Sequence, residues 1–162
     1  MNSIEKYFSS EKQESILFVL VGIIGIAISS YFLVKMKRPF YIGMAYPLIA
    51  IAFIQIVVGS TVYVRSPKDI ARVTLILHTE ESSIQTEEIP RMEVVMKNFK
   101  IYRWIEIALL LLGLVMYLYL APASLYKGIG LGLLIQSSFM LALDYFAENR
   151  GEIYLEFLRN CQ

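Results

Sequence analysis

The sequence predicts an all-α integral membrane protein: a four-transmembrane-helix antiparallel bundle with a small cytoplasmic helical cap. Of its 162 residues, 57% are apolar and 18% are charged, whereas a soluble domain has about 45–50% apolar and about 25% charged residues. The apolar residues form four uncharged runs, and tyrosine and tryptophan residues lie near the ends of these runs, as they do at membrane interfaces. This pattern excludes a disordered chain, a disulfide scaffold and an ordinary water-soluble enzyme. We expect a single membrane domain over residues 1–162.

Each of the four runs can cross a bilayer as one helix. A helix rises about 1.5 Å per residue, so about 20 apolar residues cover the roughly 30 Å of hydrocarbon. We expect the spans at about 15–34, 40–64, 101–120 and 124–146. Pro122 marks the short turn that connects the third span to the fourth. The first run follows several glutamates and ends at a Lys/Arg cluster, which favours a retained span over a cleaved signal peptide.

The lysines and arginines predict the side of the membrane on which each loop lies. With the N-terminus in the cytoplasm, 11 of the 15 lie inside, seven of them between the second and third spans. The positive-inside rule therefore places both termini and this central segment in the cytoplasm, although Lys35, Lys37 and Arg38 in one short loop argue for the opposite orientation. Short spans flanked by Lys and Arg, without organelle signals, favour a bacterial inner membrane.

Two segments are expected outside the bilayer, where they form the cap. The central segment, about 65–100, contains two helix-start signals, Ser66 followed by proline and Pro90. The helix that begins at Pro90 continues into the third span over about 30 residues. The C-terminal segment, about 148–160, has one apolar and one charged face, which predicts an amphipathic helix separated from the fourth span at Gly151.

Two carboxylic acids within the spans are the most informative polar residues. Glu106 lies just inside the third span and Asp144 near the end of the fourth, so an antiparallel pair of helices places both at similar depth. Ionisable groups in a span face the protein interior or a wet cavity. With Arg65, Arg103 and Glu148, they predict a polar cluster at the cytoplasmic mouth of the bundle. Three interpretations stay open: paired charges that set helix depth, a binding or proton-handling site, and an acid–base couple.

Small and weakly polar residues within the spans predict close helix packing. Six side chains are candidates for hydrogen bonds between the second and fourth spans: Gln55, Ser60, Thr61, Gln136, Ser137 and Ser138. The residues expected at helix contacts are Gly22, Gly25, Ser29, Gly128, Gly132 and Ser137.

The composition also excludes several kinds of site. Cys161 is the only cysteine and His78 the only histidine, too few for a disulfide, a Cys metal site or a bis-histidine haem. A net charge of +1 gives no drive towards nucleic acid. The glycines from Gly128 to Gly132 follow no strand, so they do not form a phosphate-binding loop. We expect no metal, no cofactor, no nucleic-acid partner and no catalytic residue.

Three functions remain compatible with these features. The first is a non-catalytic membrane protein that binds or assembles with a partner, as an accessory or protective, immunity-type subunit. The alternative is a transporter or channel subunit, or a binder of lipid or a small ligand, which uses the polar cluster. The third is an enzyme that modifies lipid. The expected partners are membrane lipid and a protein partner or a second copy of the chain.

Overall fold

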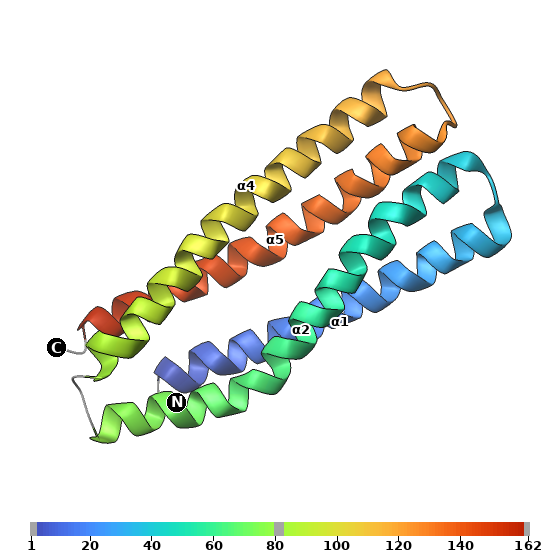
Figure 1. Cartoon of the computed structure of the whole chain (residues 1–162). Coiled ribbons are helices and arrows are strands. Elements are labelled where there is room, and N and C mark those ends of the chain that lie inside the picture. The colour runs from blue at the N-terminus through green and yellow to red at the C-terminus, as the bar shows by residue number, and fades with distance from the viewer. Residues whose placement is uncertain (1–2, 80–82, 161–162) are drawn as a thin grey trace.

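The computed structural model is all-helical, and it describes residues 3–79 and 83–160. Cys161 and residues 80–82 of the central segment lie outside the described residues. The elements are α1 (Ser3–Tyr31), a π-helical turn η1 (Phe32–Met36), α2 (Pro39–Thr79), a π-helical turn η2 (Ile84–Glu88), α4 (Ile89–Tyr119) and α5 (Leu125–Asn160) (Figure 1). All four long helices are long and apolar enough to cross a membrane, as the uncharged runs predict.

The helices are arranged as two hairpins, α1 with α2 and α4 with α5 (Figure 1). Contacts between α2 and α5 join the hairpins, and α1 touches α5 over a smaller interface. Both chain ends lie at the same end of the molecule. We call this end the cap; it comprises residues 3–14, 65–79, 83–100 and 148–160. The turn between α1 and α2 and the turn between α4 and α5, which contains Pro122, lie at the opposite end.

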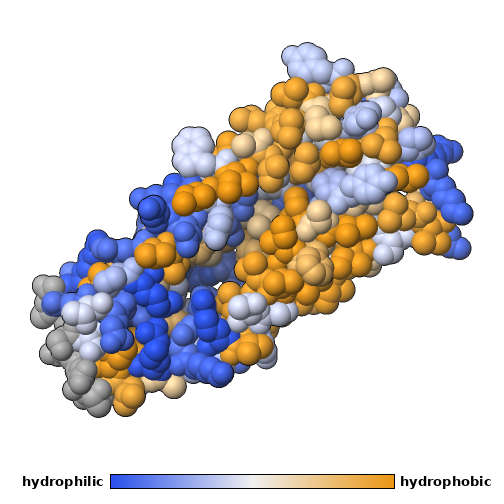
Figure 2. All heavy atoms as spheres, in the orientation of Figure 1, coloured by the Kyte–Doolittle hydropathy of each residue, from blue (hydrophilic) through white to orange (hydrophobic). Residues whose placement is uncertain are grey.

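The face of the molecule seen in Figure 2 is mostly apolar between the two ends. Large side chains such as Phe53 and Trp104 are more than half exposed, at 65% and 69%. In water so large an apolar surface would drive association, whereas in hydrocarbon its exposure carries no such penalty. Polar atoms gather at the cap and at the opposite tip. This distribution is that of helices suited to a bilayer.

Glycines allow the close approach of helices at the α1–α2 and α2–α5 interfaces. A Cβ on Gly22 would lie 2.8 Å from the carbonyl oxygen of Ala52, and one on Gly132 would lie 2.7 Å from that of Met44. A side chain at Gly128 would collide with the α2 backbone. Four glycines that were not among the expected contact residues are packed as tightly: Gly43, Gly59, Gly113 and Gly130.

The other three expected contact residues have different surroundings. A Cβ on Gly25 would lie 3.2 Å from that of Ala52. Ser29 is fully buried, but its hydroxyl donates to the carbonyl of Gly25 in its own helix, at 2.7 Å. Ser137 is buried in α5, and its hydroxyl has no hydrogen-bond partner among the described residues.

Two predicted helix boundaries are wrong. Helix α2 passes without interruption through Ser66 and Pro67, and α5 passes through Gly151. The hydroxyl of Ser66 is buried and donates to the carbonyl of Val62 at 2.9 Å instead of capping a new helix. Gly151 provides room for Met96, whose sulfur would lie 2.8 Å from an added Cβ. The cap is therefore built from extensions of the long helices.

The start of α4 agrees with the prediction. Helix α4 has 31 residues and carries Pro90 in its first turn, where the missing N–H breaks no intrahelical bond. The N-terminal part of α1 also belongs to the cap. The sequence patterns predict only the central and C-terminal segments there. The hydrophobic core of the cap has buried residues from all four long helices and η2, and they are Phe8, Val73, Ile84, Met92, Tyr154 and Leu158.

Candidate functional site

A cavity of about 540 Å³ lies between the two hairpins, and residues from all four long helices line it. Helix α4 packs on α5, and α1 packs on α2. The four helices share a core in the cap, and beyond the cap the cavity lies between α4 and the α1–α2 pair. Figure 2 shows a hollow in this part of the surface, where the apolar region meets the cap. Much of the wall is apolar and includes Phe18, Phe99, Leu109 and Met140. The volume falls within the roughly 300–1,000 Å³ of small-ligand sites.

Charged side chains also line this cavity, and they are Glu11, Glu14, Arg65, Glu106, Asp144 and Arg150. The two arginines pair with the two acids of α1. Arg65 donates to Glu11 at 3.2 Å, and Arg150 forms an ion pair with Glu14. These pairs leave Glu106 and Asp144 as the acids of the cavity wall without a basic partner among the described residues.

Glu106 is the most unusual of these groups. The residue is only 6% exposed. Neither of its carboxylate oxygens has a hydrogen-bond partner among the described residues. The ionisable group that interacts with it is Asp144, across the α4–α5 interface. Two carboxyl groups in such proximity repel each other when both are ionised, so a proton or a cation between them stabilises the pair.

The structure divides the five residues of the predicted cluster. Arg65, Glu106 and Asp144 line the cavity. Arg103 instead donates to Glu148 at 2.9 Å, and these two residues do not line it. Arg65 points to Glu11 and to Asp69, at 2.9 Å, rather than to the acids of α4 and α5.

Three charged residues of the cavity were not foreseen from the sequence: Glu11, Glu14 and Arg150. The two glutamates precede the first span and appear there as ordinary flanking charges. Their spacing of three residues is a usable signal, since residues three apart share a helix face, and this face continues into Ser15 and Phe18 of the cavity wall.

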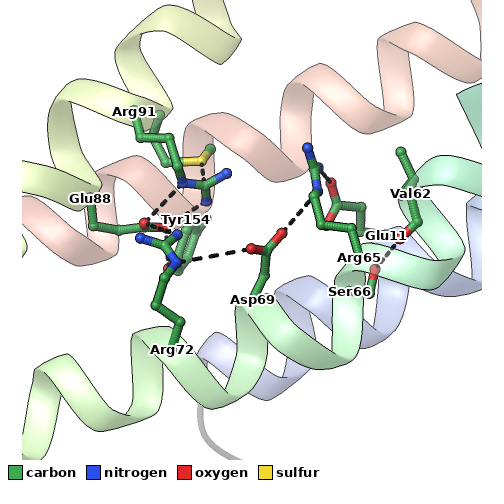
Figure 3. Close-up of polar contacts among 10 residues, drawn as sticks. Glu11, Val62, Arg65, Ser66, Asp69, Arg72, Glu88, Arg91 and Tyr154 are labelled. Atoms are coloured by element: carbon green, nitrogen blue, oxygen red, sulfur yellow. Dashed lines mark hydrogen bonds and ion pairs between the residues drawn. The ribbon is translucent and has the colours of Figure 1, made fainter.

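A second polar cluster lies in the cap and is centred on Glu88, which is fully buried. Arg91 donates to both of its carboxylate oxygens, at 2.6 and 2.9 Å, and Arg72 donates at 2.8 Å (Figure 3). The hydroxyl of Tyr154 donates at 3.2 Å. Burial raises the pKa of Glu88, but the hydrogen bonds and positive charges of the two arginines outweigh it and hold the pKa below its usual value.

Polar contacts connect the cavity to the Glu88 cluster along α2 (Figure 3). Arg65 and Arg72 lie on either side of Asp69, with N–O distances of 2.9 and 3.9 Å. Tyr7 provides a second connection, because it lines the cavity and its ring stacks on that of Tyr154 at a centroid distance of 4.2 Å. The cap therefore fixes the position of the charged wall of the cavity.

Of the six side chains expected to form hydrogen bonds between helices, Gln55 and Gln136 form one with each other. The hydroxyls of Thr61 and Ser138 instead donate to backbone carbonyls of their own helices. The amide of Gln136 donates to the side-chain oxygen of Gln55 at 2.9 Å, and both residues are buried. Gln55 also lines the cavity, as does Ser137 with its unpartnered hydroxyl. The cavity wall thus contains neutral polar groups as well as the two acids.

Within residues 3–79 and 83–160, no group of three or more His, Cys, Asp or Glu side chains is arranged to hold a metal ion. Comparison of the chain with known protein families, with characterised proteins and with solved structures finds no match. The geometry of the cavity is therefore the basis for assigning a function.

Proposed function

We propose that the protein is a non-catalytic integral membrane protein that binds a lipid-like or other small amphiphilic ligand in the cavity between its hairpins. The observation that carries this proposal is the cavity itself, which combines apolar walls with a buried, unpartnered carboxyl group, Glu106. Apolar walls with a few convergent polar groups are typical of small-ligand sites. A polar residue kept within a span is likewise typical of ligand and ion pathways.

The proposed setting is a bacterial inner membrane, with the four long helices as an antiparallel set of spans. The excess of Lys and Arg supports a cytoplasmic cap with both termini inside. In this arrangement the cavity lies in the cytoplasmic leaflet. The separation of α4 from α1 and α2 then offers lipid-soluble molecules a lateral entry.

A cavity-filling substitution tests this proposal. Ala147 lines the cavity, and Ala142 lies on the exposed side of the same helix. In detergent micelles, the neutral probe N-phenyl-1-naphthylamine should bind wild-type protein in saturable fashion, measured by the increase in its fluorescence. Ala147→Phe should abolish this binding, and Ala142→Phe should preserve it. Equal binding by both variants, or no saturable binding to the wild type, contradicts the proposal.

A second proposal is assembly with a protein partner or with a second copy of the chain, as an accessory or immunity-type subunit. The exposed side of α4 supports it, because Trp104, Leu111, Leu118 and Tyr119 leave a large part of that helix uncovered. A partner helix could pack along this side. Chemical crosslinking in membranes that yields only monomer under every condition would contradict this second proposal.

A further inference from the structure

We propose that the cavity selects an amphiphilic organic cation, a molecule with an apolar body and one positive charge, and that Glu106 and Asp144 provide its counter-charge. This inference rests on the proposed ligand-binding function and specifies the chemical class of the ligand. It depends on three features of the wall: the charge left unpaired, the placement of that charge, and the apolar surface around it.

The unpaired charge in the cavity is negative. Arg65 and Arg150 are each engaged by a glutamate of α1, and Arg65 is further held by Asp69. Glu106 of α4 and Asp144 of α5 interact with each other, and neither has a basic partner among the described residues. An anionic ligand would add to their repulsion, and a neutral ligand would leave it unchanged, whereas a cation relieves it.

The position of Glu106 directs this charge to the cavity. The residue is buried and lines the cavity, and both carboxylate oxygens lack a partner among the described residues. A buried carboxylate is unfavourable unless it is paired or protonated. A ligand cation that reaches the cavity would therefore gain an interaction that the folded chain itself does not provide.

The remaining wall favours an organic cation over a hydrated metal ion. The aromatic rings of Phe18 and Phe99 and the side chains of Leu109 and Met140 line the same cavity. Apolar walls cannot replace the water shell of an inorganic ion, but they bind an apolar body well. A ligand that joins a single positive charge to such a body matches both parts of the wall.

Two probes of nearly equal size and opposite charge test this inference: tetraphenylphosphonium and tetraphenylborate. Binding to wild-type protein in uncharged detergent micelles is measured by equilibrium dialysis at constant sodium chloride. The phosphonium should bind at least about tenfold more tightly than the borate. Glu106→Gln combined with Asp144→Asn should weaken phosphonium binding by at least about tenfold and remove the preference.

The control pair is Glu93→Gln with Glu152→Gln, which removes two exposed carboxylates of the cap that do not line the cavity. It should retain the preference. Binding of the neutral probe N-phenyl-1-naphthylamine reports whether each variant keeps its folded cavity. If the neutral probe binds but the wild type does not prefer the phosphonium, this inference is wrong and the ligand-binding proposal stands. If the neutral probe does not bind to the wild type, the proposed function itself fails.

Discussion

Replacement of Glu88 by alanine should destabilise the cap strongly, because this carboxylate joins three elements of the chain. It is fully buried and accepts hydrogen bonds from Arg91, Arg72 and Tyr154. The substitution removes the carboxylate that pairs with Arg91 and leaves Arg72 only its longer contact with Asp69, at 3.9 Å. It also leaves a buried tyrosine hydroxyl without its acceptor.

The magnitude follows from these contacts. Removal of one member of a buried ion pair costs about 3–5 kcal/mol. The side chains of Arg72 and Arg91 are 38% and 27% exposed, so water takes over part of their solvation after the substitution. We therefore expect a loss near the lower limit, about 3 kcal/mol, which corresponds to a roughly 100-fold change in the equilibrium for opening the cap.

Hydrogen exchange measured by mass spectrometry can detect this change. Amides in peptides covering residues 84–99 should exchange roughly 100-fold faster in Glu88→Ala than in the wild type, since their exchange follows local opening. The control is Glu93→Ala, whose carboxylate pairs with Arg159 at 2.7 Å while both side chains are more than half exposed. An exposed pair contributes under about 1 kcal/mol. Acceleration of less than about fivefold in Glu88→Ala would refute the proposed role of the buried carboxylate.

Two further predictions concern pH and helix packing. Because the folded-state pKa of Glu88 lies below its usual value of 4.5, its stabilisation is present above about pH 4.5 and is lost as the pH falls through the folded-state value. The difference in Tm between wild type and Glu88→Gln should therefore shrink below pH 4.5; a difference that grows on acidification would contradict this assignment. Gly132→Leu should lower stability by about 1–3 kcal/mol through overpacking against α2, seen as a lower Tm in detergent micelles, while Ala142→Leu on the exposed side should change it by less than about 0.5 kcal/mol.

Several features could be predicted because their cause is local. Pro90 lacks an N–H and has a fixed backbone angle, so it suits the first turn of α4 in any tertiary context. Glu106 lies near the start of the apolar part of α4 and Asp144 near the end of that of α5, which places them at similar levels along the two helices once the chain turns near Pro122. Both acids line one cavity for this reason.

Other features could not be predicted, because distant parts of the chain override the local signal. Ser66 and Gly151 are ordinary helix boundaries by local chemistry, yet both lie inside continuous helices. The N-terminal part of α1 was treated as a flank, but Glu11 and Glu14 reach Arg65 and Arg150, far along the chain. Nothing near either glutamate in sequence identifies its partner.

The sequence by itself determined the number and approximate position of the long apolar helices. Transfer of a segment into hydrocarbon depends on that segment's own composition, so this property can be read from 20 residues at a time. Tertiary structure decided which charges are neutralised and which have no partner among the described residues. The isolation of Glu106 and the full burial of Glu88 both depend on side chains brought together from separate helices, because a charge is stabilised only by groups within a few ångströms of it.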